Sequence, residues 1–275
     1  MVQVRSPADR TDAMAGYLLI PTSQLAVVGV AGLACLCLSF LAAVCARTTL
    51  DYPVALFLDG FVATRSVPKD LLLGLFRVDV LQGPLFVAAV WLVWFDTNDR
   101  ARRARIATGV AGAALAGLLS RGLQLVLPTH QRPLHDAALA FVPPPWIDAG
   151  LLNHWNSFPS DHAALFFGLA TVVCLMRPRL GLAVFAWALL VNLIRVYEGL
   201  HFLTDIIGGA GLGVAVVCLS QLAAARRACE ALLRRAADAA GWFYAGAFLV
   251  TYEVAVLFED VRQVGGGLAR LLAGH

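Results

Sequence analysis

The chain has almost no lysine and few charged residues of either sign. Only 14% of its 275 residues are charged and 60% are hydrophobic, whereas an ordinary soluble domain carries roughly 25% charged residues. Lys69 is the only lysine. This composition excludes an ordinary soluble domain and indicates a polytopic membrane protein. The net charge of +3 comes from short arginine clusters at the ends of apolar runs, so no nucleic-acid partner is expected.

The sequence also lacks the ligand spacing of a metal site. None of the six cysteines is spaced with histidine as structural or catalytic metal ligands are. Five of them lie inside apolar runs, where cysteine acts as a small hydrophobic residue. We therefore expect neither a metal nor another cofactor. The cysteines are Cys35, Cys37, Cys45, Cys174, Cys218 and Cys229.

Long apolar runs are abundant, and they predict an all-α protein with six transmembrane helices, since a span needs ~20 apolar residues. A short apolar piece at 71–76 is expected to form an interfacial helix. The chain then divides into a cytoplasmic N-terminal segment (1–24), a six-span domain (25–225) and a C-terminal tail (226–275). In the tail, the apolar stretch 239–258 contains Glu253 and predicts an interfacial helix or, as the alternative, a seventh span. The predicted spans are 25–46, 80–95, 106–127, 162–176, 180–194 and 202–225.

Arginine placement orients these spans. The basic stretches 96–105 and 177–179, the N-terminus and the tail all fall on one side of a six-span arrangement. Cytoplasmic loops are enriched in lysine and arginine, so that side is expected to be cytoplasmic. The loop 128–159 and the stretch 195–205 then meet at the outer face.

The stretch from Arg195 to Asp205 lies between two apolar runs. Ionisable groups at that depth are costly and usually mark a functional site. His201 and Asp205 are four residues apart, so on a helix the carboxylate could hold one imidazole nitrogen and leave the other as a nucleophile. Arg195 offers a planar cation for phosphate oxygens. The alternative is a helix-end salt bridge with a snorkelling arginine.

Two further polar clusters are predicted on the same face. Ser160, Asp161 and His162 open the predicted fourth span, where unpaired N–H groups favour an anion; the alternative is an ordinary helix cap. His162 is placed to give a proton to a leaving oxygen. Arg132 either adds a second guanidinium or is a solvated loop residue. Together these residues are the set that phosphoryl transfer through a phosphohistidine requires.

In order and spacing, these motifs resemble those of the type 2 phosphatidic acid phosphatase superfamily, which shares its site with vanadium haloperoxidases. Pro159-Ser-Asp-His162 resembles the Pro-Ser-Gly-His motif. Arg195-x5-His201-x3-Asp205 resembles Ser-Arg-x5-His-x3-Asp, with Ile194 in place of serine. Arg132-Pro133 resembles the end of Lys-x6-Arg-Pro. The resemblance covers residues 70–225 and implies a six-transmembrane helical bundle of that kind.

The resemblance also implies a role for each residue. His201 would be the nucleophile, Asp205 its orienting partner and His162 the general acid. The phosphate would be bound by Arg132, Arg195 and Ser160, helped by the backbone amides of Ser160, Asp161 and His162.

The chain departs from the motifs at two positions. Leu125 stands where the first motif has lysine. Arg121, one turn deeper on the same helical face, is the best substitute as a phosphate ligand because a long side chain could reach outward; it could instead pair with a neighbouring helix or a lipid headgroup. His130 and Lys69 are the other possible cations. Asp161 replaces the motif's glycine and must turn outward to pair with a cation.

The sequence therefore predicts an integral-membrane phosphatase for a lipid phosphate or diphosphate, such as undecaprenyl diphosphate or a phosphatidate-like lipid. The expected location is a bacterial inner membrane, with the site facing the periplasm and membrane lipids around it. One alternative is a phosphotransferase that uses the same phosphohistidine. Another is a non-catalytic lipid transporter or binding protein on the same fold, which the missing lysine would suit and the two histidines would not. Haloperoxidase activity is not expected, because those enzymes are soluble.

Overall fold

A computed structural model describes residues 21–63, 74, 78–128, 130–148, 150, 152, 155–236, 239–261 and 264. The described residues form helices and connecting loops and contain no β-strand, so the predicted all-α class is confirmed. Lys69 and most of the predicted interfacial helix at 71–76 lie outside the described residues. The helices are α2 (Thr22–Cys45), α3 (Arg47–Ala63), α5 (Gly83–Phe95), α6 (Arg100–Val126), α7 (Asp161–Met176), α8 (Pro178–Tyr197), α9 (Leu203–Ser220), α10 (Ala223–Ala236) and α11 (Ala240–Ala255), with short 3-10 turns at Asp79–Leu81 and Pro133–His135.

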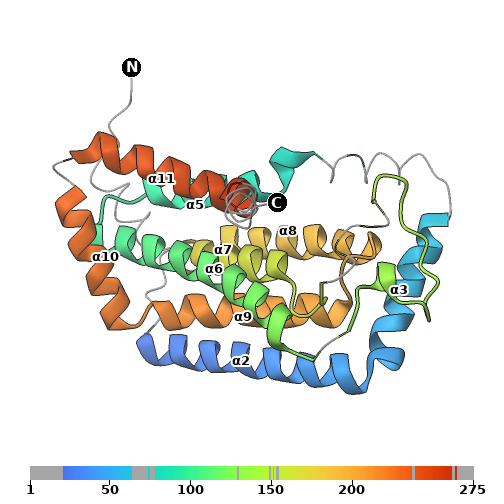
Figure 1. Cartoon of the computed structure of the whole chain (residues 1–275). Helices are drawn as coiled ribbons and strands as arrows, with labels where there is room; N and C mark the ends of the chain where they lie inside the picture. Colours follow the sequence, from blue (N-terminus) through green and yellow to red (C-terminus); the bar gives the residue numbers. More distant parts are fainter. Residues whose placement is uncertain are drawn as a thin grey trace, which may run out of the picture.

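Among the described residues, four helices are long and apolar enough to cross a membrane, namely α2, α6, α8 and α9. The shorter apolar helices α5 and α7 occupy the places of the second and fourth predicted spans. These six helices run roughly along one direction in Figure 1, as membrane-crossing helices do. The polytopic membrane architecture follows directly from the apolar runs of the sequence.

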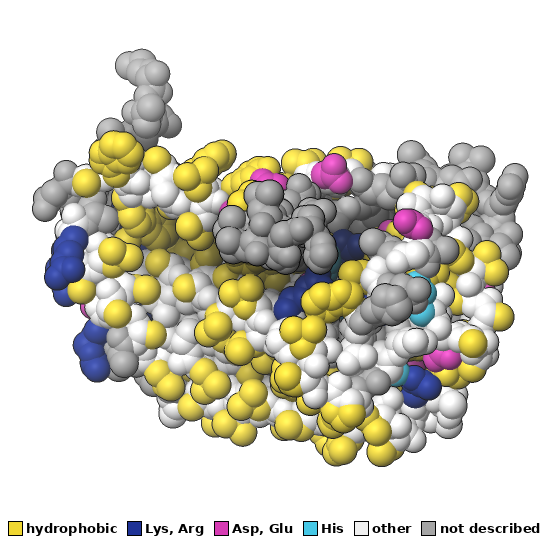
Figure 2. All heavy atoms as spheres, in the orientation of Figure 1, with side chains coloured by type: hydrophobic (Ala, Val, Ile, Leu, Met, Phe, Trp, Pro, Cys, Tyr) yellow, Lys and Arg dark blue, Asp and Glu magenta, His cyan; other side chains and the backbone are white. Residues whose placement is uncertain are grey.

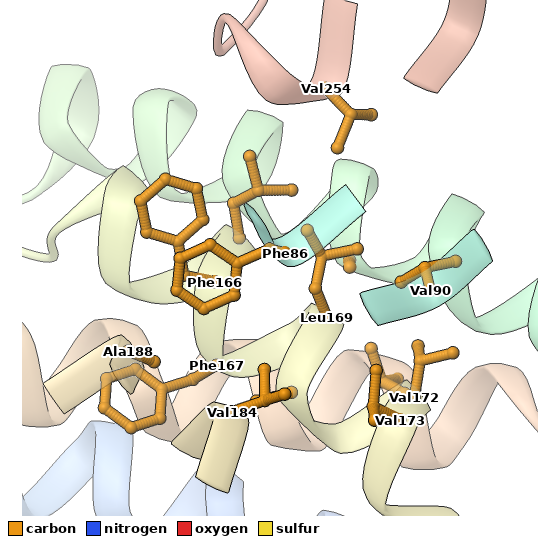
Figure 3. Close-up of a cluster of buried hydrophobic side chains, with 14 of the residues drawn as sticks. Phe86, Val90, Phe166, Phe167, Leu169, Val172, Val173, Val184, Ala188 and Val254 are labelled. Atoms are coloured by element: carbon orange, nitrogen blue, oxygen red, sulfur yellow. The ribbon is translucent and has the colours of Figure 1, made fainter. Parts of the chain in front are cut away.

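Helix α7 forms the centre of the bundle, because most of its side chains are buried. It packs against α5, α6, α8 and α9. Phe86 of α5 stacks on Phe166 of α7 with ring centroids 4.3 Å apart, and Figure 3 shows these rings among aliphatic side chains from α5, α7, α8 and α11. A helix that is apolar on all sides is stable only when it is buried in this way. The first turn of α7 is therefore held rigidly.

Glycines allow α7 and α9 to approach closely. A Cβ atom on Gly209 would lie 2.3 Å from the carbonyl oxygen of Ser160, and one on Gly213 would lie 2.2 Å from that of Ala164. Small residues at helix interfaces permit such backbone contact in membranes. We call this contact the glycine seam. It fixes the start of α7 beside the start of α9, where the second and third motifs lie.

Several helix boundaries differ from the predicted ones. The basic stretch predicted as a loop at 96–105 is helical from Arg100, because Asp99 caps α6 by accepting a hydrogen bond from the amide of Ala101 and the arginines and alanines that follow favour helix. The turn predicted at 177–179 already begins α8, with Pro178 in its first turn. The sixth predicted span ends at Ser220 rather than Ala225, and α10 follows.

The tail helix α11 lies along α5 (Figure 1). Near the end of α5, Trp94 stacks on Phe243 at 5.8 Å. At the start of α5, a Cβ atom on Gly83 would lie only 1.8 Å from the carbonyl oxygen of Ala255. The two helices are thus antiparallel neighbours along the whole of α5. Since α11, at 16 residues, is not among the described helices long and apolar enough to cross a membrane, the interfacial helix and the seventh span both stay predictions for 239–258.

Candidate active site

The predicted site residues meet at one end of the bundle. They lie at the starts of α7 and α9, at the end of α8, and in the long loop that follows α6, which runs beside α3 at the right of Figure 1. Basic and histidine side chains are visible in the middle and right of the face shown in Figure 2, among hydrophobic side chains. The site is thus formed by loops and helix ends rather than by the middle of a helix.

His201 lies in the loop before α9, because that helix begins at Leu203. The prediction that His201 and Asp205 share a helical face is therefore wrong. The loop nevertheless brings His201 Nδ1 within 3.1 Å of the carbonyl oxygen of Ser157 and 3.4 Å of Asp205 Oδ2. Both neighbours are acceptors, so Nδ1 carries the proton and Nε2 carries the lone pair. That is the tautomer a nucleophilic histidine needs.

Asp205 is fully buried and holds the loop in shape. Its Oδ2 accepts hydrogen bonds from the hydroxyl of Ser157 and, at 2.6 Å, from the amide of Phe202. Its Oδ1 faces His130 Nε2 at 3.6 Å, too far for a hydrogen bond. Burial lowers the pKa of His130, although the nearby Asp205 carboxylate opposes that shift. Asp205 therefore orients His201 partly by direct contact and partly by holding Ser157.

Arg132 is one of the most deeply buried side chains, with 1% of its surface exposed. Its Nη1 donates to the carbonyl oxygen of Leu200 at 2.5 Å and lies 3.2 Å from His201 Nε2. Burial lowers the pKa of Arg132 to about 10, so it remains a cation at neutral pH. Burial, followed by this guanidinium, lowers the pKa of His201 well below its usual value. His201 is thus held neutral.

His162 and Arg195 form a second pair of the same kind. Arg195 Nη2 lies 2.8 Å from His162 Nε2, while His162 Nδ1 lies 3.1 Å from Asp161 Oδ1. Arg195 also contacts Glu198 and Gln82 at 3.5 Å each. In both pairs a guanidinium faces the Nε2 atom of a histidine. The structure therefore brings together His201, His162, Arg132 and Arg195 at one end of the bundle, with both arginines near enough to His201 to oppose a positive charge on it.

Arg121 and Asp161, which were both expected to contact the phosphate, contact each other. Arg121 Nε lies 2.8 Å from Asp161 Oδ2, and its guanidinium lies 5.3 Å from the centre of the Trp155 ring. Asp161 turns to a cation as the sequence requires. Leu125 is 68% exposed at the surface of α6, which is where an apolar side chain belongs in a membrane.

Ser160 caps α7, since its side chain accepts a hydrogen bond from the amide of Ala163 at 3.3 Å. Two of the backbone amides expected to help bind phosphate are engaged within the protein. The amide of Ser160 donates to the carbonyl oxygen of Asp205 at 3.0 Å, and that of His162 donates to Asp161 Oδ1 at 3.0 Å. The hydroxyl of Ser160 remains available as a donor.

Sequence reasoning missed several residues that shape the site. Ser157 contacts both Asp205 and His201, and its only signal was its place two residues before Pro159. On α6, Ser120 and Gln124 both donate to the carbonyl oxygen of Pro159, at 2.8 and 2.7 Å. These two polar side chains in an apolar helix were a signal, because such groups need partners in a membrane. They hold the second motif against α6.

No group of three or more histidine, cysteine, aspartate or glutamate side chains within the described part of the chain could hold a metal ion. The groups that converge are two arginines and two histidines, with one carboxylate beside each histidine. Such a set suits an anion with several oxygens, and the buried lone pair on His201 suits attack on it.

Comparison with known proteins finds a family match over the part of the chain that contains the three motifs. Residues 127–228 match the model of the PAP2 superfamily. The chain is 39% identical over 59 residues to the Bacitracin transport permease protein BcrC of Bacillus licheniformis, covering 22% of this chain and 29% of the relative. It is 30% identical over 161 residues to a Lipid A 1-phosphatase of Rhizobium etli, covering 58% of this chain and 60% of the relative.

Both matches thus span less than two thirds of the relative's length. Among solved structures, a PAP2 type phosphatidylglycerolphosphate phosphatase from Bacillus subtilis is similar with a TM-score of 0.48 and 21% identity. That similarity covers 70% of this chain and 94% of the other.

Proposed function

We propose that the protein is an integral-membrane lipid phosphatase acting through a phosphohistidine, on the premise that residues 127–228 match the model of the PAP2 superfamily. One observation carries the proposal. Two histidines present their Nε2 atoms to two arginines at one end of the bundle, and each histidine has its Nδ1 atom held by acceptors. Cations for the phosphate, a nucleophile and an acid are therefore assembled together.

In the resting protein each guanidinium lies against the lone pair that the reaction needs. A bound phosphate offers Arg132 and Arg195 stronger, charge-assisted partners than an imidazole lone pair does. We expect both arginines to turn to the phosphate oxygens, joined by the hydroxyl of Ser160. Substrate binding thereby frees the Nε2 atoms of His201 and His162. Arg121 and Asp161 remain paired with each other in this scheme.

The chemistry then takes two steps. When Arg195 turns to the phosphate, His162 Nε2 takes up a proton from water. His201 Nε2 then attacks phosphorus, the bond from phosphorus to the lipid oxygen breaks, and the departing oxygen takes that proton from His162 Nε2. Neutral His162 next takes a proton from water, the water oxygen bonds to phosphorus, and the N–P bond breaks to release inorganic phosphate. Asp205 stays ionised and holds the imidazolium that forms at His201.

The substrate class proposed is a lipid phosphate or diphosphate, such as undecaprenyl diphosphate or a phosphatidate-like lipid. The site lies at the end of membrane-crossing helices, and the R. etli relative carries the name of a lipid phosphatase. The proposed location is a bacterial inner membrane with the site towards the periplasm, because the arginine-rich ends of α6 and α10 lie at the opposite end of the bundle. A transport role is the second candidate, because the B. licheniformis relative is named a permease.

The test is phosphate release by the purified protein from a panel of lipid phosphates and diphosphates. In parallel, the phosphoenzyme is trapped under alkaline conditions, where phosphohistidine is stable, and an acid-treated sample, in which phosphohistidine is hydrolysed, is the control. We expect turnover by the wild type, no turnover and no phosphoenzyme in His201→Ala, and phosphate binding without turnover in His162→Ala. Chelators should leave turnover unchanged. Appreciable turnover by His201→Ala would refute the phosphohistidine, and transfer of phosphate to an added alcohol would identify a phosphotransferase.

A further inference from the structure

The pair formed by Arg121 and Asp161 has no role in the scheme above. Asp161 is 5% exposed and lies at the first position of α7, directly before His162. A buried carboxylate is costly unless it is paired and hydrogen-bonded. Here Oδ1 accepts from the amide of His162 at 3.0 Å and lies 3.1 Å from its Nδ1, while Oδ2 lies 2.8 Å from Arg121 Nε. The carboxylate thus bridges the histidine and the arginine.

On this basis we propose that Asp161 is the positioning residue of His162, and that Arg121 serves the reaction through Asp161 rather than by binding phosphate. The inference rests on the proposed phosphatase function. The geometry repeats that of the nucleophile, because each histidine has its Nδ1 held by protein oxygens and its Nε2 turned to an arginine. Each histidine therefore has a carboxylate of its own.

The charges explain why both residues are needed. His162 must hold a second proton to act as an acid, yet Arg195 lies 2.8 Å from its Nε2 and opposes a positive charge there. A carboxylate at Nδ1 favours the imidazolium and fixes the direction of Nε2. Without Arg121, that carboxylate would be an unpaired charge beside the incoming phosphate. The arginine cancels its repulsion.

Arg121 is poorly placed for a direct contact with phosphate. Its Nε lies 2.8 Å from Asp161 Oδ2 and its guanidinium lies 5.3 Å from the centre of the Trp155 ring, so both ends of the guanidinium are already engaged. The same carboxylate and guanidinium line a cavity with Gly117, Leu165 and Phe258. Asp161 is 7% exposed at this pair and Arg121 25%, so the carboxylate is the more deeply buried partner and depends on the arginine for its charge balance.

A leaving-group comparison tests this role. An alkyl lipid phosphate needs a proton on its departing oxygen, whereas an aryl phosphate such as p-nitrophenyl phosphate leaves as a stable anion. We measure kcat/KM, which covers the steps through formation of the phosphoenzyme, for dioleoyl phosphatidate and for p-nitrophenyl phosphate with the full-length protein in detergent. Asp161→Asn should lower the value for phosphatidate on the order of 100-fold, within the range that general acids contribute, and the value for p-nitrophenyl phosphate by less than about 5-fold.

Arg121 provides a second, independent variant. Arg121→Gln should show the same selective loss, Arg121→Lys should restore most of it, and Arg121→Gln combined with Asp161→Asn should be no worse than Asp161→Asn alone, because residues that act as one unit are not additive. A matched control is Glu230→Gln, which breaks the pair of Arg226 with Glu230 (3.6 Å) on α10, away from the site. It should leave both substrates unaffected.

Equal losses with both substrates would mean a merely structural role and would overturn the inference. Weaker inhibition of Arg121→Gln by inorganic phosphate, with additive loss in the double variant, would assign Arg121 to phosphate binding and overturn it too. Failure of the wild type to release phosphate from either substrate is a different result, because it would overturn the phosphatase function itself.

Discussion

The hydroxyl of Ser157 offers the sharpest test of the nucleophile's geometry. It donates to Asp205 Oδ2, and the carbonyl oxygen of the same serine accepts from His201 Nδ1. Ser157→Ala removes the hydroxyl alone and leaves the carbonyl in place. Asp205 then keeps the amide of Phe202 but loses its other buried donor.

The expected effect follows from the strength of that bond. A hydrogen bond to a charged group contributes about 1.5–3 kcal/mol, and each 1.36 kcal/mol corresponds to a tenfold change in rate. If the reacting imidazolium depends on Asp205 being held in place, Ser157→Ala should slow phosphoenzyme formation roughly 10- to 150-fold. The assay is kcat/KM for lipid phosphate, with thermal unfolding measured on the same sample to exclude a loss of folded protein.

Ser39→Ala is the matched control. The Ser39 hydroxyl is also buried, but it donates to the carbonyl oxygen of Cys35 within its own helix at 2.8 Å. Its removal should leave turnover unchanged. If Ser157→Ala retains turnover within about twofold of the wild type, a difference of less than 0.5 kcal/mol, the idea that Asp205 acts partly through Ser157 is refuted.

Three further predictions concern pH, packing and topology. Because burial and Arg132 lower the pKa of His201 below the usual 6.5, His201 stays neutral as the pH falls through 6.5, and the acid limb of kcat/KM should appear only below that pH; a limb at or above 6.5 would contradict this. Gly213→Ala places a Cβ atom against the carbonyl oxygen of Ala164 and should destabilise the protein by about 1–3 kcal/mol, measured by thermal unfolding, whereas Gly246→Ala, with open space around it, should not. A cysteine at the exposed Ala138 should react with a membrane-impermeant reagent in whole cells beyond the wild-type background; labelling only after lysis would reverse the proposed orientation.

Much of the helical frame could be predicted, because an apolar run long enough to cross a membrane has few other stable structures. The starts of α2 and α7 and the whole of α5 lie within a few residues of the predicted spans. Boundaries in polar segments were harder. The high charge of Arg100 to Arg105 predicts a loop, yet these residues are helical because Asp99 caps the start of α6. The position of α11 depends on packing against α5, which no local pattern encodes.

The candidate site shows the same division. The motif residues were found because histidine, arginine and aspartate are conspicuous in an apolar sequence. Their contacts were not predictable, since they depend on a loop. Pairing of His201 with Asp205 was inferred from helical spacing, but it arises from a turn before α9. Ser157 escaped notice because serine in a loop is ordinary, and its importance comes from a carboxylate 48 positions away.

The glycine seam has a consequence for how mutational data on this protein would be interpreted. Asp205, Gly209 and Gly213 recur every four residues on one face of α9, so the carboxylate beside His201 continues the row of glycines that touch α7. A saturation library scored by activity alone would return one uniformly intolerant stripe, while Ile207 on the exposed side would accept most apolar substitutions. Only a parallel measurement of protein abundance distinguishes the position needed for turnover from the positions needed for packing. Asp205 variants would persist in the membrane without turnover, whereas variants of the two glycines would be lost from it.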